Sequence, residues 1–272
     1  MSRWFERLIF NGSGPAAAGP VVITLVGSGG KTSLIWFLAR HFSQSRGLLK
    51  ILVSPSTKMF PPLRPEHALH CYYDGAPPVP AMGITLAGML NKKTGKLEAL
   101  PPAELQQTAG AYDLVFIEGD GSRGLPLKGW ADHEPVVPPF TTFTVGMLPL
   151  WPLGKPVNRE IAHRLPLFRT LTGADEGEAL GLDHFAALIS GNTKNAEHST
   201  VRSLFTAARG KKLLFFNQIE DEAAFSGAYR LVLSLPPEFR FGLHKIIAGS
   251  VQRDTVREIH GLLAPSSYDE LY

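Results

Sequence analysis

One segment near the N-terminus constrains the fold more than any other, because an apolar run, a glycine-rich loop and an amphipathic stretch follow one another directly. Residues 21–26 are nearly all apolar and mostly branched, which is typical of a strand buried on both faces of a sheet. Residues 31–42 repeat apolar side chains at helical spacing, and a second apolar run covers residues 48–53. This strand, helix, strand order predicts a parallel sheet, since parallel neighbours need a crossover between them.

Later segments continue the same alternation of strands and helices. We expect core strands at 113–117, 143–147 and 212–216, a helix at 102–109, and a hairpin formed by 84–89 and 96–99. Residues 161–190 are expected to be mostly helical and to form a small helical subdomain. The sequence therefore predicts an α/β fold with a mainly parallel sheet flanked by helices.

Composition narrows the function classes. Hydrophobic residues make up 44% of the 272 and charged residues 19%, so the chain can bury a core and is not of the disordered class. The 27 basic and 24 acidic residues leave a net charge of +3, and the basic residues are scattered, so no nucleic-acid partner is expected. The single cysteine cannot form an internal disulfide, and no apolar run approaches the roughly 20 residues that cross a membrane. We expect a cytoplasmic protein without a membrane partner.

The loop between the first strand and the first helix predicts a phosphate-binding site. Its residues are Gly27, Ser28, Gly29, Gly30, Lys31, Thr32 and Ser33. Glycines let backbone N–H groups close around phosphate oxygens, Lys31 can neutralise them, and the Thr32 hydroxyl can ligate the Mg²⁺ of a nucleotide. The usual P-loop spacing would need glycine where Leu25 stands, so this shorter loop looks like the G-x-x-G-K-[ST] variant of the Mur ligases. The expected cofactors are Mg²⁺ and a nucleoside triphosphate, ATP or GTP.

Two carboxylates follow the strand expected at 113–117, as in a Walker B segment. Glu118 and Asp120 would lie at the carboxyl end of the sheet, where ligands bind in such folds, and either could hold Mg²⁺ or orient its water. The alternative is that these acids only cap the next turn. The turn after the second strand contains Thr57, whose hydroxyl is a further candidate for the metal, although a plain Ser/Thr turn fits equally well.

With this loop, residues 21–272 are interpreted as one P-loop nucleotide-binding domain, and residues 1–20 as a flexible N-terminal lead-in. Asn217 and Glu220 follow a late strand, where GTPases carry N-K-x-D for the base, and base recognition by these two residues is one of two equal alternatives, the other being chance. Glu66, His67, His70 and Cys71 could bind zinc, but an ordinary loop is the favoured interpretation, because no second cluster completes a site.

Three motifs together carry a resemblance to a known family. V-G-S-G-G-K-T-S, V-S-P-S-T-K-M-F and F-I-E-G-D-G-S-R-G-L-P-L-K-G-W-A-D-H-E-P-V-V-P are similar to the YqeC family, described as accessory proteins of selenium-dependent molybdenum hydroxylases. The similarity extends over most of residues 20–250. It implies a P-loop nucleotide-binding fold and a role in the maturation of a molybdenum enzyme.

The resemblance also implies roles for individual residues. It assigns Gly30, Lys31 and Thr32 to the phosphate loop, Glu118 and Asp120 to the metal, and Thr57 to the same site. Arg123 or Lys128 would stabilise charge on a transferred phosphoryl group. His133 and Glu134 would bind a second substrate.

Two functions from different classes are consistent with these residues. The first is an Mg²⁺-dependent nucleoside triphosphate hydrolase or transferase that acts with a molybdenum hydroxylase or its cofactor-maturation proteins. The second is a nucleotide-gated chaperone or carrier for the apo-hydroxylase or its cofactor, with no useful hydrolysis. A Mur-like ligase is a third, suggested by the short loop alone.

Overall fold

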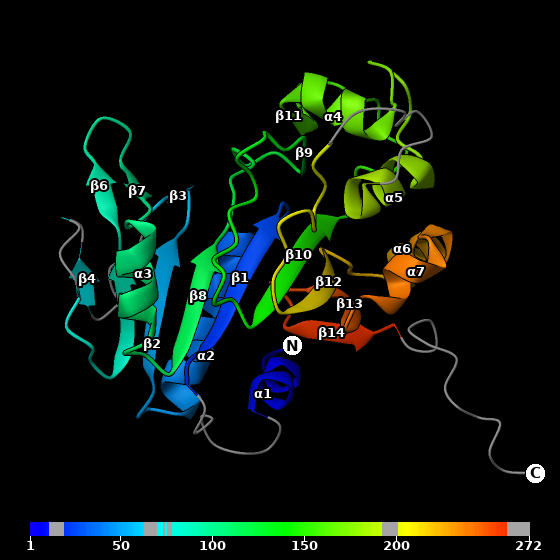
Figure 1. Cartoon of the computed structure of the whole chain (residues 1–272). Helices are drawn as coiled ribbons and strands as arrows, with labels where there is room; N and C mark the ends of the chain where they lie inside the picture. Colours follow the sequence, from blue (N-terminus) through cyan, green and yellow to red (C-terminus); the bar gives the residue numbers. More distant parts are fainter. Residues whose placement is uncertain (11–18, 63–69, 73, 75–77, 192–200, 260–272) are drawn as a thin grey trace, which may run out of the picture.

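The structure, a computed structural model, describes residues 1–10, 19–62, 70–72, 74, 78–191 and 201–259 (Figure 1). Its helices are α1 (Ser2–Phe10), α2 (Lys31–Ser45), α3 (Pro102–Ala109), α4 (Leu165–Thr172), α5 (Leu182–Ser190), α6 (Glu222–Ser234) and α7 (Pro237–Phe241). Its strands are β1 (Val21–Gly27), β2 (Lys50–Pro55), β3 (Lys58–Met59), β4 (His70–Tyr72), β5 (Gly83–Ala87), β6 (Met89–Asn91), β7 (Lys96–Glu98), β8 (Leu114–Glu118), β9 (Leu127–Lys128), β10 (Phe143–Pro149), β11 (Ala162–His163), β12 (Lys211–Asn217), β13 (Lys245–Ser250) and β14 (Thr255–Glu258).

A large sheet forms the centre of the molecule. Within the described residues it has nine strands in the order β14-β13-β12-β10-β1-β8-β2-β5-β4, and every neighbouring pair is parallel except β13 with β14. β1 lies between β10 and β8, and its Ile23 is in register with Phe143 on one side and Phe116 on the other. The mixed α/β fold with a mainly parallel sheet is therefore confirmed.

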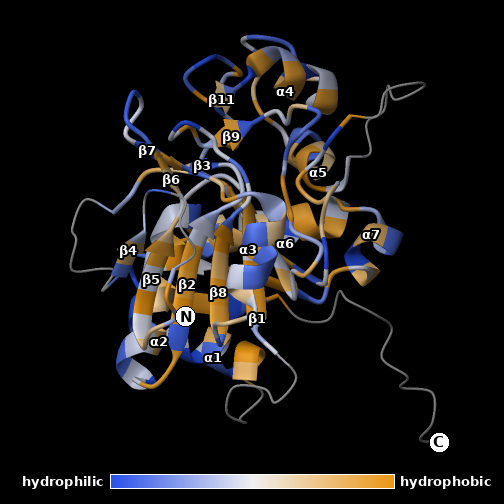
Figure 2. Ribbon diagram, turned by 60° about the vertical axis from the view of Figure 1, so that its left-hand side comes forward, coloured by the Kyte–Doolittle hydropathy of each residue, from blue (hydrophilic) through white to orange (hydrophobic). Residues whose placement is uncertain are grey.

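Alternate side chains of the strands point to opposite faces of the sheet, and both faces are buried. Ile23 and Leu25 face one side, where they join a buried cluster with residues of α1 and α2. Val22 faces the other side, in a cluster with residues of α3, and Val26 belongs to the cluster that contains α4, α5 and α6. Figure 2 shows the strands of the large sheet mostly in orange, the colour of hydrophobic residues. Burial on both faces explains why the strand segments read as continuous apolar runs.

The connections between strands change side beside β1. After β1 the chain passes through α2 to β2 on one side of β1, whereas after β8 it passes to β10 on the other side. In open α/β sheets, ligands bind outside the carboxyl ends of strands where the connections change side. The glycine loop that follows β1 lies at this edge, as do Glu118, the last residue of β8, and Asp120, which follows it.

Three expectations from the sequence need correction. Residues 1–20 are not all a flexible lead-in, because α1 buries Phe5, Ile9 and Phe10 against the core, while residues 11–18 lie outside the described part. Residues 84–87 belong to β5 of the large sheet, and the hairpin is formed by β6 and β7 instead. Between β5 and β6, a Cβ on Gly88 would lie 2.9 Å from the Glu98 carbonyl oxygen, so this position requires glycine.

The segment 161–190 is helical over most of its length, as expected, but it does not form the expected subdomain. It contains β11, α4 and α5, with turns and extended backbone between the two helices. α4 and α5 pack against the rest of the molecule through the same core that holds α6, so within the described residues they do not form a separate core. None of the helices in the described part of the chain is long and apolar enough to cross a membrane.

The burial of α1 makes a testable prediction about stability. Phe5 has no exposed surface, so Phe5→Ala should lower the free energy of unfolding by about 3 kcal/mol or more, the usual cost of removing a buried ring. The neighbouring exposed Arg7 serves as the control, and Arg7→Ala should change stability by less than about 0.5 kcal/mol. Denaturant unfolding of both variants checks this. Equal stabilities would show that α1 does not belong to the folded core.

Candidate functional site

The glycine loop between β1 and α2 adopts a backbone conformation that residues with a side chain rarely adopt. Gly27, Gly29 and Gly30 all have positive φ, at 96°, 78° and 110°. A Cβ on Gly27 would lie 2.2 Å from the Met147 carbonyl oxygen, and one on Gly30 would lie 2.7 Å from Asn217 Nδ2. These glycines are therefore required by both backbone conformation and close packing.

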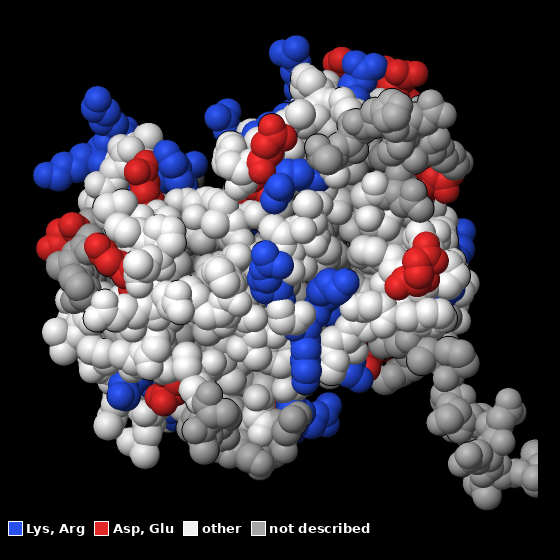
Figure 3. All heavy atoms as spheres, viewed as in Figure 1, with Lys and Arg blue, Asp and Glu red and all other residues white. Residues whose placement is uncertain are grey.

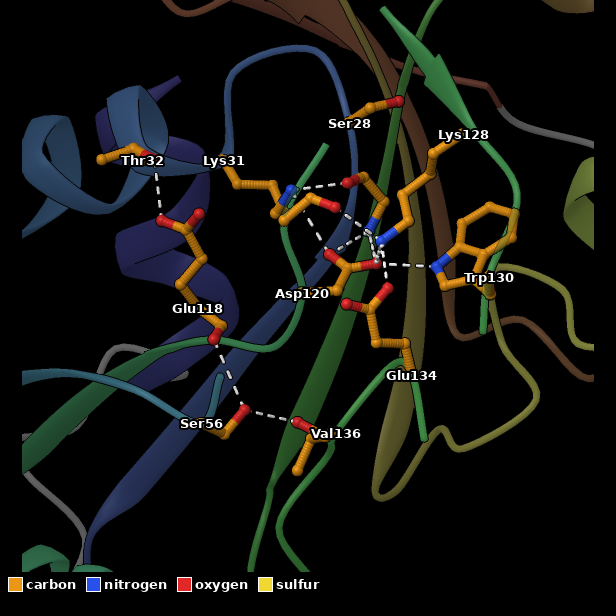
Figure 4. Close-up of polar contacts among 12 residues, drawn as sticks. Ser28, Lys31, Thr32, Ser56, Glu118, Asp120, Lys128, Trp130, Glu134 and Val136 are labelled. Atoms are coloured by element: carbon orange, nitrogen blue, oxygen red, sulfur yellow. Dashed lines mark hydrogen bonds and ion pairs between the residues drawn. The ribbon is translucent and has the colours of Figure 1, made fainter. Parts of the chain in front are cut away.

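Asp120 is the buried acceptor that holds this loop in place (Figure 4). The Gly27 N–H donates to both of its oxygens at 2.9 and 3.1 Å, and the Trp130 indole N–H donates to Oδ2 at 2.7 Å. Lys31 Nζ lies 3.3 Å from Oδ1 and Lys128 Nζ lies 3.2 Å from Oδ2. The carboxylate predicted as a metal ligand thus already has four partners, and its geometry is that of a positioning residue.

Lys128 continues this network away from the loop. Its side chain is fully buried and donates to the Gly121 carbonyl and to Glu134 Oε2, both at 2.7 Å. Arg164 donates to the two oxygens of Glu134, at 2.5 and 3.1 Å. The structure therefore places Lys128 and Glu134 in a buried ion-pair network, which we call the 120–164 network, rather than on the surface of the cleft described below.

Burial alone would raise the pKa of Glu134, but the Arg164 guanidinium and the Lys128 ammonium outweigh it and lower this pKa to about 2. Glu134 is therefore ionised throughout the neutral range, as its two cationic partners require. His133, its neighbour, is exposed and is not among the residues that line the cleft described below.

Thr32 and Glu118 form a second polar pair at the opposite side of the loop. Thr32, in the first turn of α2, donates its hydroxyl hydrogen to Glu118 Oε2 at 2.7 Å. Burial raises the pKa of Glu118, against the opposing effects of Lys31 and of the Thr32 hydrogen bond. A hydroxyl and a carboxylate side by side supply the hard oxygen ligands that Mg²⁺ prefers.

Thr32, Glu118 and Lys31 line a cleft of 740 Å³ at the carboxyl end of the sheet. Its walls are Gly29, Gly30, Lys31, Thr32, Ser33, Lys58, Met59, Phe60, Lys96, Glu118, Gly121, Ser122, Arg123, Gly124, Leu125, Pro126, Trp151 and Gln218. Four of these side chains are cationic and only Glu118 is anionic. The cleft is thus suited to an anion that carries several negative charges.

Some of the other predicted site residues line the cleft, and others do not. Ser33 and Arg123 line the cleft, and Arg123 has the positive φ of 54° that is rare outside glycine. Ser28 is buried and donates to the Pro126 carbonyl at 2.6 Å. Thr57 does not line the cleft, although its buried hydroxyl has no hydrogen-bond partner among the described residues. Its role at a metal stays a prediction.

Asn217 and Glu220, the two residues predicted to recognise the nucleotide base, contact different parts of the structure. Asn217 donates to the Gly29 carbonyl at 2.7 Å and accepts from the Val251 N–H at 3.1 Å, so it fastens the glycine loop to β13 and its following turn. Glu220 instead pairs with Arg253 at 2.7 Å and does not line the cleft. Gln218, with a φ of 64°, occupies the cleft wall at this position.

The zinc hypothesis falls partly outside the described residues. Glu66 and His67 lie there, while His70 and the exposed Cys71 are on β4. No group of three or more His, Cys, Asp or Glu side chains in the described ranges could hold a metal ion.

Several cleft residues were missed by sequence reasoning. Lys58 follows β2 and forms an ion pair with Glu98 at 2.8 Å, while Lys96 Nζ lies 4.6 Å from the centre of the Phe60 ring. Trp151, after β10, is half exposed at the cleft edge. Lys58 and Phe60 belong to the motif V-S-P-S-T-K-M-F, but neither was predicted to bind a ligand. Lys96 and Trp151 come from a hairpin and a loop that no local pattern connects to the glycine loop.

Comparisons with known proteins now place the chain. A family model described as YqeC protein matches residues 23–166. The chain belongs to the YqeC family. It is 30% identical over 175 residues to the uncharacterized protein YqeC of Escherichia coli strain K12, an alignment that covers 62% of this chain and 68% of that protein. No solved structure matches significantly. The part that matches the YqeC model contains the glycine loop, both acids after β8 and the whole 120–164 network.

The lowered pKa of Glu134 predicts a specific acid sensitivity. A carboxylate whose folded pKa is below its usual 4.5 stabilises the fold fully above that pH, and this stabilisation is lost as the pH falls from about 4.5 towards 2. Glu134→Gln should remove this part of the pH dependence, a slope of up to about 1.4 kcal/mol per pH unit. Unfolding free energies measured from pH 5 to 2.5 test it. The exposed Glu160 supplies a control, because Glu160→Gln leaves the network intact and should retain the slope of the unmodified protein.

Proposed function

We propose that this YqeC-family protein is a P-loop protein that binds an Mg²⁺-nucleoside triphosphate in the 740 Å³ cleft and hydrolyses it or transfers a group from it. The observation that carries the proposal is the Thr32–Glu118 hydrogen bond of 2.7 Å at the end of a glycine loop, in a cleft that is otherwise cationic. A hydroxyl from the loop and an acid from a neighbouring strand are the usual protein ligands of Mg²⁺ in P-loop NTPases.

The residues present fit such a metal. Glu118 is almost wholly buried and its raised pKa reflects missing solvation, which a cation at its oxygens would replace. Thr32 and Glu118 would hold Mg²⁺. When bound, Mg²⁺ neutralises phosphate oxygens and withdraws charge from the phosphoryl group.

The cations of the cleft would hold the polyphosphate. Lys31 Nζ now donates to the Gly27 carbonyl at 2.5 Å and pairs with Asp120, so it is held at the loop, ready to turn towards a phosphate. Lys58, Lys96 and Arg123 enter the cleft from three other segments. Charge-assisted hydrogen bonds from such groups position the nucleotide and stabilise charge that develops during phosphoryl transfer.

The biological step that we propose for this activity is the maturation of a selenium-dependent molybdenum hydroxylase or of its cofactor. The family resemblance of the three sequence motifs supports this assignment. The nucleotide-gated chaperone or carrier is the alternative outcome, in which the same cleft binds the triphosphate without useful turnover.

Nucleotide binding provides the first test. Calorimetric titration with ATP, GTP and CTP in the presence of Mg²⁺ should show binding, and Lys31→Ala should weaken it by about 1.5–3 kcal/mol, roughly ten- to a hundredfold, because a charged hydrogen bond is lost. Phosphate release with the tightest nucleotide then measures turnover. Binding without turnover above that of Lys31→Ala would favour the chaperone, and absence of binding would refute the proposal.

Thr32 offers a matched pair of variants for the metal. Thr32→Ser keeps the hydroxyl and should retain Mg²⁺-dependent binding, whereas Thr32→Val keeps the shape and should lose the difference in affinity between Mg²⁺ and EDTA conditions. Equal behaviour of the two variants would remove Thr32 from the metal site. Circular dichroism of both confirms that the fold is unchanged.

Trp151 is expected to stack on the base. Its exposed ring borders the cleft, and Trp151→Ala should weaken nucleotide binding by about 1–3 kcal/mol while leaving tripolyphosphate binding unchanged. The exposed Tyr229 on α6 lies away from the cleft walls, so Tyr229→Ala is the aromatic control. A parallel loss of tripolyphosphate affinity would show that Trp151 shapes the cleft and does not contact the base.

A further inference from the structure

A second cavity, of 630 Å³, lies next to the nucleotide cleft and is more strongly basic. Its walls are Arg123, Leu125, Arg159, Ala162, His163, Arg164, Leu165, Pro166, Arg169 and Glu176. Four of the ten residues are arginines, and the only acid is the exposed Glu176. Basic side chains are visible around β11 and α4 at the upper rim in Figure 3. We call this cavity the arginine pocket.

The two cavities adjoin. Arg123 and Leu125 line both of them, and Arg123 comes from the segment that follows the acids of β8. A ligand in the arginine pocket would therefore lie beside whatever occupies the cleft, with the Arg123 side chain at the boundary. Two substrates of a transfer reaction need this kind of proximity.

The arginines of the pocket are not all neutralised. Arg164 pairs with Glu134 and Arg169 pairs with Asp175 at 3.0 Å, whereas Arg123 and Arg159 have no ion-pair partner among the described residues. Arg123 and Arg164 both have positive φ, near 55°. Such backbone strain in non-glycine residues concentrates at binding sites, where the surrounding structure maintains it. Uncompensated arginines in a concave site recognise phosphate with forked hydrogen bonds.

His163 adds a neutral polar group to this pocket. Burial lowers its pKa to about 4, and the charges of Arg164 and Arg123 act in the same direction. At neutral pH the ring is therefore uncharged, with one nitrogen that can donate a hydrogen bond and one that can accept a hydrogen bond. The apolar walls formed by Leu125, Ala162 and Leu165 leave room for the uncharged part of a ligand.

We propose that the arginine pocket binds the second substrate, a small molecule that carries a phosphate group, beside the nucleotide. Arg123 and Arg159 would bind the phosphate, with Arg164 held in position by Glu134. This inference rests on the proposed function for its role, but the binding site itself can be tested without a nucleotide.

The test is a calorimetric titration with inorganic phosphate, once with the protein alone and once with the cleft filled by Mg²⁺ and a non-hydrolysable nucleotide analogue. Phosphate should bind in both cases. Arg159→Ala should weaken this binding about tenfold or more, because it removes a charged hydrogen-bond donor, and it should leave nucleotide affinity unchanged. Arg230→Ala, an exposed arginine on α6 outside the pocket, is the matched control and should bind phosphate normally.

The possible results are distinguishable. Equal phosphate affinities of Arg159→Ala and Arg230→Ala would overturn the arginine pocket as a site. Equal binding of malonate and phosphate would overturn the assignment to phosphate. If the analogue fails to bind while phosphate binding still depends on Arg159, the proposed nucleotide function fails and the pocket remains. Loss of phosphate binding when the analogue is present would show that phosphate occupies the nucleotide cleft instead, and would overturn the inference.

Discussion

The candidate site depends on one buried carboxylate. An ionised group inside a protein is costly unless donors and opposite charges compensate it, and Asp120 has no exposed surface. Its compensation comes from the Gly27 N–H, the Trp130 indole and the ammonium groups of Lys31 and Lys128. These donors belong to the glycine loop, the first turn of α2, and β9 with the loop after it. Satisfying Asp120 therefore fixes three segments relative to one another.

This constraint separates the roles of two acids that look equivalent in the sequence. Glu118 ends β8 beside the cleft, where Thr32 donates to it. Asp120 stands only two residues later, but it faces the interior and the loop backbone. An acid with one protein donor can still bind a cation, whereas an acid with four partners would have to lose several of them. For the proposed Mg²⁺ site, the geometry thus favours Glu118 over Asp120 as a ligand, whereas Asp120 holds the backbone of the loop.

Local signals made the centre of the fold predictable, and long-range packing decided the rest. The expected strand at 21–26 and helix at 31–42 correspond to β1 and α2. Both could be predicted because the spacing of apolar residues and the position of glycines are evident over a short stretch of sequence. The same approach missed α1, whose Phe5 belongs to a buried cluster with residues of α2 and the sheet that are distant in sequence. It also grouped Asn217 with Glu220, since spacing along the chain does not reveal that one side chain turns to the glycine loop and the other to Arg253.

The pairing of buried charges also explains why basic side chains predominate in the walls of the two cavities. From Lys31 through Asp120, Lys128 and Glu134 to Arg164, positive and negative groups alternate in contact, so each buried charge has a partner of opposite sign. Removing Asp120 would take the acid partner from the buried Lys31, and removing Glu134 would take it from Arg164, while Lys128 would keep one acid in either case. Loss of a buried partner is far more costly than loss of a surface pair. Asp120 and Glu134 are thus used to pair the cations of this buried network. Among the described residues, only one acid lines each of the two cavities, Glu118 in the cleft and Glu176 in the arginine pocket. As a result, basic side chains outnumber acidic ones in the walls of both the cleft and the arginine pocket. This excess of positive charge favours anionic ligands in both cavities.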